Sequence, residues 1–197
     1  AAVADDYPLA GLGTNSSDAF NWPKVAGDTN IHGSLAAAVP GYIKGIWLAL
    51  QNFGTMTWQD VFEPACQQAE LGLPIDWFSA QKISLFARGL KLYPETSRIY
   101  LADGLPPTIN LDGTLARLIL GKLAETYRLL QSKGAAEFYQ GDLAARIVAD
   151  LSEAGSRITI EDLQNYEASI AEPISLPYRG CTLHVPGPLT AGPSIAH

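Results

Sequence analysis

The residues of this sequence best suited to chemistry near neutral pH are three histidines and several hydroxyl side chains. His32, His184 and His197 stand apart from one another, and none belongs to an H-E-x-x-H or similar metal-ligand spacing. A serine nucleophile would need a G-x-S-x-G elbow or an equivalent triad, and the sequence contains no such elbow. Because His184 lies in a strand-like segment, we interpret it as a structural histidine rather than a general base.

Two further patterns resemble functional loops only superficially. Gly11 and Gly13 have part of the spacing of a phosphate-binding loop, but a preceding strand, a third glycine and a lysine are missing. The hydroxyl of Thr190, in the loop 189–192, could face a pocket, and we interpret this loop as a packed turn. Neither pattern identifies a catalytic residue.

The paired carboxylates and the two cysteines also have structural interpretations. Asp5-Asp6 and Glu161-Asp162 are adjacent in the sequence, which is typical of turns and helix caps. Cys66 lies in a helical pattern and Cys181 in a strand pattern, and neither has a second Cys or a His at ligand spacing. We therefore expect buried apolar cysteines rather than a metal site, and leave open whether the two pair.

The stretch from residue 31 to 54 organises the elements that would position any site. It begins with a small apolar run, 35–39, for which we predict a short buried strand that Pro40-Gly41 interrupts, Pro40 suiting the first turn of the next helix. Beyond this break a helical spacing places five apolar residues on one face: Ile43, Ile46, Trp47, Leu50 and Phe53. Gly54 is expected to end this helix in the left-handed conformation.

The rest of the pattern predicts a mostly helical chain. Residues 1–30 lack periodicity and are interpreted as a loop anchored by Phe20 and Trp22. Pro64 is expected to divide the helical segment that begins at Thr57, and Gly72 to close it. Periodicity, caps and glycine stops predict further helices at 77–91, 122–132, 135–139, 142–154 and 159–166, with one weak turn near residues 99–100.

The period changes near the carboxyl end of the sequence. Segments 170–176 and 181–185 are strand-like, and Tyr178-Arg179-Gly180 joins them as a hairpin or a turn between neighbouring strands. Pro173 and Pro177 restrict the first of them to an edge or a bulge. A proline-rich loop follows, and residues 194–197 look like the beginning of a helix. The expected fold class is therefore α+β, a mostly helical segment ending in a short β hairpin.

Charge and hydropathy exclude several classes of function. The formal charge is −7 and the sequence pI is about 4.8, which argues against a nucleic-acid surface because such a surface needs clustered Lys and Arg. No apolar run reaches the ~18 residues of a membrane span. The first residues lack the basic start and apolar middle of a signal peptide, and we expect both ends of the sequence to lie inside a longer protein.

Several blocks together resemble the γ-glutamyltransferase family. Residues 38–75 contain A-V-P-G-Y-I-K-G, F-G-T-M-T-W and P-A-C-Q-Q-A-E-L-G, where the family reads A-V-P-G-x-x-x-G, F-G-x-L-x-W and P-A-x-x-x-A-x-x-G. Four later blocks agree in order and spacing: 123–127, 134–141 (G-A-A-E-F-Y-Q-G), 158–166 (I-T-I-E-D-L-Q-N-Y) and the segment from Glu172-Pro173 through Tyr178-Arg179-Gly180 into the proline-rich loop. The resemblance extends from about residue 33 to the end.

The resemblance implies an N-terminal-nucleophile hydrolase with a four-layer αββα fold. Such proteins cut themselves and expose a Thr at the start of the small subunit, whose hydroxyl is the nucleophile and whose α-amino group is the base. A γ-glutamyl group then passes through an acyl-enzyme to water or an amine, without metal or organic cofactor. The implied partners are that small subunit and a small-molecule γ-glutamyl substrate, with no nucleic acid and no membrane span.

The departures from the family pattern determine what this chain itself can contribute. The family's Gly-rich segment and substrate-carboxylate Arg would precede Ala1, and the cleavage site and nucleophilic Thr would follow His197. Thr190 is not that Thr, because 187–192 departs from the family's P-P-S-S-G-G. We therefore assign no catalytic residue and no metal ligand here, and leave the substrate-binding residues unassigned. Family members are often exported, which favours a periplasmic or secreted location without fixing it.

The resemblance divides the chain into three regions. Residues 1–30 are a loop-rich lead-in, 31–166 the helical region of the large subunit, and 167–197 strands and loop that belong to the central sheet of the full protein. Two alternative functions remain: an amide or β-lactam side-chain acylase of the same superfamily, suggested by the altered loop 187–192 and by Asn21-Trp22-Pro23, and a non-catalytic helical interaction module.

Overall fold

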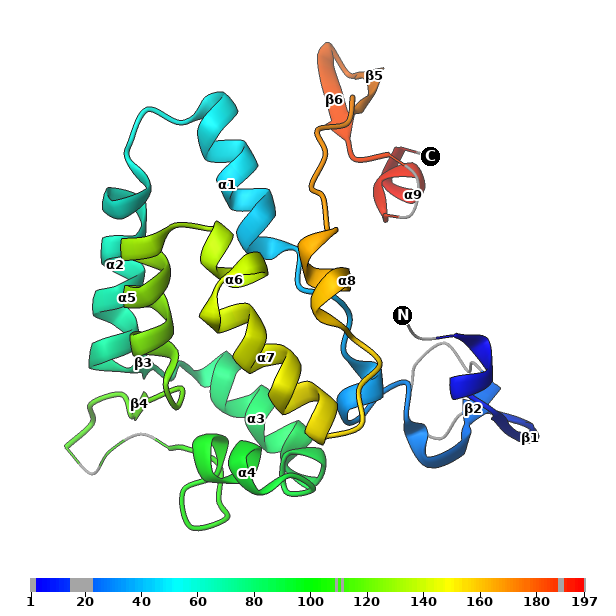
Figure 1. Cartoon of the computed structure of the whole chain (residues 1–197), viewed down its shortest axis with the longest axis vertical. Helices are drawn as coiled ribbons and strands as arrows, with labels where there is room; N and C mark the ends of the chain where they lie inside the picture. Colours follow the sequence, from blue (N-terminus) through cyan, green and yellow to red (C-terminus); the bar gives the residue numbers. More distant parts are fainter. Residues whose placement is uncertain (1–2, 15–22, 109, 111, 188–189, 197) are drawn as a thin grey trace. The chain divides into compact units, whose positions relative to one another are not determined.

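Figure 1 shows the computed structural model, which describes residues 3–14, 23–108, 110, 112–187 and 190–196, with backbone alone for 11–14. Contacts divide the chain into two compact units, Ala1–Tyr166 and Glu167–His197. Helices dominate, and the strands of the described residues form three two-stranded sheets. The predicted combination of mostly helical structure with a β hairpin near the end is confirmed at this level.

The first thirty residues contain a small antiparallel sheet where the sequence predicts a loop. Strand β1 (Leu9–Thr14) pairs with β2 (Pro23–Val25), and the register shifts between its ends. The strand was missed because glycines interrupt the alternation that would have marked it. Gly11 and Gly13 lie within β1, while Phe20 and Trp22 lie outside the described residues. Short 3-10 turns flank the sheet: η1 (Ala4–Asp6) and η2 (Ala26–Asp28).

The predicted strand at 35–39 is wrong. Its beginning forms the 3-10 turn η3 (Ser34–Ala36), and residues 37–41 have no regular structure. A strand needs a partner, and no strand in the described residues pairs with this run. Pro40 does not occupy the first helical turn either, because Gly41 is the N-cap and the helix begins one residue later.

Helix α1 (Tyr42–Phe53) forms where the apolar spacing predicts it. Four of the five predicted inward residues contact the core: Ile43, Ile46, Trp47 and Leu50. Phe53 is 74% exposed, so its assignment to that face is wrong. It lies in the last turn of α1 and does not pack against the core that covers the others.

Gly54 ends α1 in an extended conformation, with φ −84° and ψ 155°, and not in the left-handed conformation that the sequence predicts. A glycine is nevertheless required. A Cβ at this position would collide with the Cδ1 and carbonyl oxygen of Leu50, whose oxygen accepts the N–H of Gly54 at 2.8 Å. The reason is close approach rather than backbone conformation.

Helix α2 (Trp58–Leu71) is continuous, and the predicted break at Pro64 does not occur. Pro64 has no N–H, so the carbonyl of Asp60, four residues earlier, loses its helical hydrogen bond. Both residues are exposed to solvent. The opposite face of the helix is buried against the core through Trp58, Phe62, Cys66 and Ala69. Burial of four apolar side chains offsets the roughly 3 kcal/mol that an interior proline costs.

The next elements begin and end close to the predicted positions. Gly72, with φ +81°, ends α2, and β3 (Leu73–Pro74) pairs antiparallel with β4 (Arg117–Leu118). Helix α3 (Trp77–Leu90) is capped by Asp76, whose carboxylate accepts the Ser79 N–H at 2.7 Å. Helix α4 (Pro94–Tyr100) is longer than the single turn that was predicted, because Pro94 begins it.

Four predicted helices complete the first unit. Their bounds are α5 (Leu123–Lys133), α6 (Ala136–Gln140), α7 (Asp142–Glu153) and α8 (Ile160–Gln164). Gly134 and Gly155 follow α5 and α7 with positive φ, as expected of helix stops. Thr159 and Asp162 form a reciprocal capping box at the start of α8.

The core of this unit lies between α1, α2 and the helices from α5 to α8. Its most deeply buried side chains are Tyr139, Leu130, Leu163 and Cys66. Trp58 joins α2 to α5, because its indole N–H donates to the carbonyl of Leu130 at 2.7 Å. The ring of Trp47 from α1 meets that indole edge-on at 5.2 Å between centroids.

The second unit is a hairpin followed by a short helix. Strands β5 (Ile174–Tyr178) and β6 (Cys181–Val185) pair antiparallel, with Arg179 and Gly180 at the turn, both at positive φ. Strand β5 begins four residues later than predicted. Pro177 lies within β5, which a two-stranded sheet tolerates because each strand has an open edge. Helix α9 (Gly192–Ala196) covers the predicted helix start.

Candidate functional site

The histidines do not form a common site among the described residues. His32 is exposed in the first unit, where a Cβ on Gly89 of α3 would lie 3.3 Å from its Cε1. His184 lies on β6 in the second unit, and His197 lies outside the described residues. Among the described residues, no group of three or more His, Cys, Asp or Glu side chains could hold a metal ion.

Ser175 and His184 face each other across the hairpin. Their Oγ and Nδ1 atoms are 2.8 Å apart, and the two residues are register partners. A hydroxyl bonded to an imidazole is one component of an activated nucleophile. Both residues are exposed, however, and no carboxylate among the described residues forms an ion pair with His184. The contact has the form of an ordinary cross-strand pair.

Thr190 occupies a locally bonded turn. Its hydroxyl donates to the carbonyl of Gly187 at 2.8 Å and accepts the N–H of Gly192 at 3.0 Å. A Cβ on Gly192 would collide with the carbonyl of Pro186, so these two residues lie in close contact. The hydroxyl therefore shapes the loop, as the packed-turn interpretation expects.

Both cysteines are free thiols, and one of the two expectations of burial is wrong. Cys66 is fully buried in α2, and burial raises the pKa of its thiol. Cys181 is exposed at the start of β6, because the second unit has too few elements to cover the hairpin. A buried thiol of raised pKa is a poor nucleophile, so Cys66 is structural.

The adjacent carboxylates behave as cap and turn residues. Asp6 accepts the N–H of Val3 at 2.9 Å within η1 and forms an ion pair with Arg157, which follows α7, at 2.8 Å. Asp162 belongs to the capping box of α8, and the N–H of Thr159, accepted at 3.0 Å, lowers the pKa of its carboxyl. The Asp6–Arg157 pair ties the amino-terminal turn to the helical core.

Three of the sequence blocks converge at the start of α1. The phenol of Tyr139, from the block 134–141, donates to the carbonyl of Pro40 at 2.8 Å and accepts the N–H of Lys44 at 3.1 Å. Tyr139 is 1% exposed, and burial raises the pKa of its phenol. The neutral phenol thus caps α1 where no local side chain does so.

The third block supplies Tyr166, whose ring stacks on that of Tyr139 at 6.0 Å between centroids. The Tyr166 hydroxyl lies so close to Gly41 that a Cβ there would collide with it. This contact explains the glycine of the A-V-P-G block in physical terms. Sequence reasoning gave Tyr139 and Tyr166 no role, although an aromatic residue at a fixed place in each block was a signal for one.

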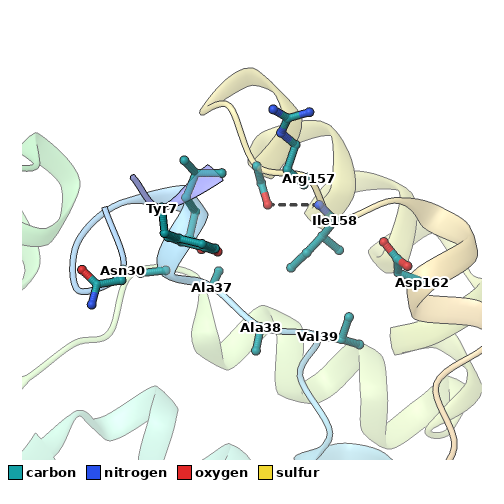
Figure 2. Close-up of a pocket in the computed structure, with 11 residues that line it drawn as sticks. Tyr7, Asn30, Ala37, Ala38, Val39, Arg157, Ile158 and Asp162 are labelled. Atoms are coloured by element: carbon teal, nitrogen blue, oxygen red, sulfur yellow. Dashed lines mark hydrogen bonds between the residues drawn. The ribbon is translucent and has the colours of Figure 1, made fainter. Parts of the chain in front are cut away.

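A cavity of about 360 Å³ opens in the first unit (Figure 2). Its lining comes from the amino-terminal segment, from the extended run before α1 and from the turn between α7 and α8: Tyr7, Asn30, Leu35, Ala36, Ala37, Ala38, Val39, Ser156, Arg157, Ile158 and Asp162. In Figure 2, the run from Ala37 to Val39 lies on one side and Arg157 and Ile158 on the other.

Two polar groups that line the cavity are engaged in contacts of their own. The hydroxyl of Tyr7 is committed to the carbonyl of Leu35 at 2.7 Å, and the Arg157 guanidinium pairs with Asp6. Its lining residues place no hydroxyl or thiol beside a base. The described residues therefore offer a shaped surface, and they contain no activated nucleophile of the triad type.

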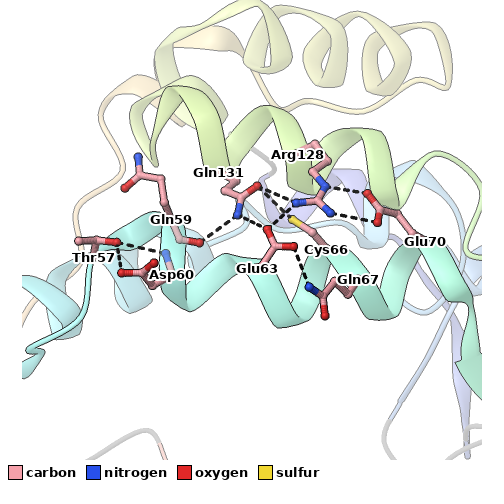
Figure 3. Close-up of polar contacts among 9 residues, drawn as sticks. All are labelled: Thr57, Gln59, Asp60, Glu63, Cys66, Gln67, Glu70, Arg128 and Gln131. Atoms are coloured by element: carbon pink, nitrogen blue, oxygen red, sulfur yellow. Dashed lines mark hydrogen bonds and ion pairs between the residues drawn. The ribbon is translucent and has the colours of Figure 1, made fainter.

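A polar network joins the outer sides of α2 and α5 (Figure 3). Arg128 binds Glu70 through two nitrogens, at 2.6 and 3.0 Å, and Glu63 through a third at 2.6 Å. Gln131 extends the network, because its amide donates to Glu63 and to the backbone of Gln59. Figure 3 shows these side chains lying along the seam between the two helices, with Cys66 between Glu63 and Glu70.

This network shifts the acidity of its members. Hydrogen bonds from Arg128, then from Gln131 and Gln67, lower the pKa of Glu63 to about 2. The bond from Arg128 also lowers the pKa of Glu70, and both carboxylates raise the pKa of Arg128. The three side chains are each more than a third exposed, so the network is a solvated clamp between helices rather than a catalytic pair.

No helix in the described part of the chain is long and apolar enough to cross a membrane. The longest helices, α2 and α3, have 14 residues each.

Comparison with known proteins gives a consistent result. A sequence model of the family described as Gamma-glutamyltranspeptidase matches residues 13–197. Glutathione hydrolase proenzyme of Bacillus subtilis (strain 168) is 33% identical over 157 residues, which are 80% of this chain and 26% of that protein. This chain spans between a quarter and a third of the length of the curated relatives it matches first.

Solved structures share the architecture. Helicobacter pylori gamma-glutamyltranspeptidase superposes with a TM-score of 0.75 and 27% identity, over 94% of this chain and 52% of the other. A cephalosporin acylase from Bacillus halodurans superposes with a TM-score of 0.62 and 26% identity, over 74% of this chain and 27% of the other. The arrangement of helices and small sheets is thus shared with both proteins.

Proposed function

The chain belongs to the gamma-glutamyltranspeptidase family, and on that premise we propose that it forms a helical part of the large subunit of an enzyme that transfers or hydrolyses γ-glutamyl amides. The acyl-enzyme forms on the N-terminal Thr of a small subunit, which lies outside these 197 residues. This Thr attacks the γ-carbonyl, its α-amino group takes the proton, and water or an amine then releases the acyl group. No metal or organic cofactor takes part.

One observation carries the proposal: the family match spans nearly the whole chain, while the described residues contain no activated nucleophile. The Ser175–His184 contact is exposed, and Thr190 is engaged in its own loop. A chain that shares the family's scaffold, and whose described residues hold no activated nucleophile, fits a supporting role. Two of the matched relatives are named as proenzymes, which supports a partner subunit generated by processing.

The three proposed regions have different tasks in that assembly. Residues 31–166 form the helical layer, held together at the Tyr139 anchor. Residues 167–197 contribute strands to the central sheet of a four-layer αββα fold, and 1–30 lead into the helical layer. The exposed hairpin of the second unit supports this assignment, because both of its faces are largely uncovered.

The test uses the complete protein that contains these residues and a γ-glutamyl p-nitroanilide. We expect release of p-nitroaniline, and its loss by at least about a thousandfold when the Thr identified by sequencing the amino terminus of the small subunit is replaced by Ala. Ser175→Ala and Thr190→Val should stay within about threefold of the parent. Loss of turnover in Ser175→Ala with intact processing would place the nucleophile in this chain and overturn the proposal.

A second candidate is an acylase that removes a β-lactam side chain or another amide-linked acyl group. The superposition on a cephalosporin acylase favours it specifically. The same complete protein distinguishes the two functions, because a glutaryl amide lacks the α-amino group of a γ-glutamyl amide. A higher kcat/KM for the glutaryl substrate would favour the acylase, and the reverse ratio the transpeptidase.

A further inference from the structure

The outward side of α3 carries an apolar patch that nothing in the described structure covers. The helix packs inward through small and aliphatic residues that are half-buried: Ala80, Ile83, Ala87 and Leu90. On the opposite side and just beyond its end lie five large apolar residues, here called the α3 outer face: Trp77, Phe78, Leu85, Phe86 and Leu92. Their exposed fractions are 77, 50, 69, 60 and 61%.

The α3 outer face differs from scattered surface hydrophobes because its members follow one another along a single helix. At 100° per residue, Leu85 and Phe78 fall near the middle of the face, and Trp77 and Phe86 fall at its sides. The rings of Trp77 and Phe78 meet edge-on at 5.8 Å between centroids, so they form one contiguous apolar end. Large exposed apolar side chains gathered on one side of a helix indicate an interaction surface.

Cations frame this apolar surface. Residues 77–93 contain Lys82, Arg88 and Lys91 and no Asp or Glu, in a chain with a formal charge of −7. On the helical projection Lys82 and Arg88 lie on opposite sides of Leu85. The carboxylates next along the chain are engaged, Asp76 with the Ser79 N–H and Glu95 with Arg98. The segment is thus locally positive within an acidic protein.

From this arrangement we propose that α3 docks on an anionic phospholipid bilayer, lying flat in its interface. Trp, Phe and Leu side chains would enter the boundary between headgroups and acyl chains, while Lys82 and Arg88, on either side of Leu85, reach the lipid phosphates. Fourteen residues make a helix of about 21 Å, which suits the interfacial plane and is too short to span the hydrocarbon core.

Charge complementarity favours lipid over a second copy of the chain. A two-fold contact through α3 would set its three cations against the same three cations of the other copy, with no carboxylate in 77–93 to offset them. The lysine content also distinguishes this face from a protein interface, where Lys is depleted. A bilayer rich in anionic headgroups meets both the apolar and the cationic features.

The experiment measures flotation of the complete protein with vesicles of phosphatidylcholine alone or with 30% phosphatidylglycerol. We expect binding to the anionic vesicles that weakens as salt rises, and little binding to the neutral ones. Trp77 should show a blue-shifted emission with anionic vesicles, and the shift should vanish in Trp77→Phe. If the complete protein does not bind anionic vesicles, something other than lipid covers the α3 outer face, and the proposal is overturned.

Two variants and one matched control sharpen the test. Lys82→Gln/Arg88→Gln/Lys91→Gln should weaken partitioning by on the order of a hundredfold, and Phe78→Ser/Leu85→Ser by at least about tenfold. Phe53→Ser, at an exposed apolar residue of α1, should leave it unchanged. Equal losses in all three variants would contradict a role for α3. If Phe78→Ser/Leu85→Ser instead dissociates a dimer without affecting vesicle binding, the face is a contact between copies and the proposal fails.

Discussion

Helices α2 and α3 are built to the same local rules and have opposite surroundings. Each has 14 residues, begins with Trp and is capped by a side chain that accepts the N–H three residues later. Trp58 of α2 is 5% exposed and bonds to the carbonyl of Leu130, whereas Trp77 of α3 is 77% exposed. The difference teaches that caps and periodicity form a helix, while a partner helix decides which of its side chains are buried.

The partner of α2 is α5, which packs against the apolar residues of α2 and also pairs with its charged side chains. Apolar residues of α2 enter the core, and Glu63 and Glu70 at its edge meet Arg128. Helix α3 has no comparable partner on its outer side in the described structure. Its outward residues are apolar and cationic, a combination that calls for a different kind of surface. Four measurements test this contrast between the two helices.

The largest effect is expected at Trp58. Trp58→Ala removes a buried indole, its hydrogen bond to Leu130 and its ring contacts with Trp47 and Phe62, and should lower the free energy of unfolding by about 3–5 kcal/mol. Urea unfolding followed by circular dichroism measures it. A loss below about 1 kcal/mol would mean that the α2–α5 seam is not a core.

The second largest effect is expected at Tyr139, which anchors the start of α1. Tyr139→Phe keeps the ring but leaves the Lys44 N–H and the Pro40 carbonyl without their partner, and should cost about 1–3 kcal/mol. Tyr42→Phe is the control, because Tyr42 is of the same type and 75% exposed. Equal unfolding midpoints for the two variants would show that the phenol of Tyr139 does not cap the helix.

The polar network between α2 and α5 predicts that the stability of the fold depends on pH. Its bonds hold the pKa of Glu63 at about 2, below its ordinary value of 4.5, so the ionised carboxylate stabilises the fold above pH 4.5. This contribution is lost as the pH falls from about 4.5 to about 2. Arg128→Gln should flatten that part of the profile of melting temperature against pH, whereas Arg88→Gln on α3 should not. An unchanged profile in Arg128→Gln would show that the bond between Arg128 and Glu63 does not stabilise the fold.

The smallest effect is expected on α3 itself. Trp77→Ala removes an exposed side chain and should change the free energy of unfolding by no more than about 0.5 kcal/mol in the absence of lipid. The same urea titration used for Trp58→Ala measures it. A loss approaching that of Trp58→Ala would mean that the two helices are not in different surroundings, and the contrast between them would collapse.

Sequence reasoning located most helices because their signals are local. The Thr57 and Asp76 caps, the capping box of Thr159 and Asp162, and the glycine stops at Gly72 and Gly134 each act within a few residues. It failed where a local signal met a distant contact. Pro64 did not break α2, because the buried face of that helix is held by α5.

The contacts around Tyr139 show the same division between local and long-range signals. The blocks that mark the family were visible in the sequence, but their physical reason was not. Tyr139 lies about a hundred residues from Pro40, whose carbonyl it binds, and Tyr166 explains Gly41 only once the two are placed side by side. The cavity in the first unit likewise combines segments that no spacing rule connects.

From the sequence alone we could predict where most helices begin or end, the family of the chain, and the lack of a sequence motif for a reaction centre. These depend on neighbouring residues, on backbone sterics and on the order and spacing of residues along the sequence. Only the tertiary structure decided that Trp58 is buried and Trp77 exposed, that 35–39 is not a strand, and that Tyr139 caps α1. Burial and long-range hydrogen bonds depend on which segments meet in space, and local sequence does not encode that meeting.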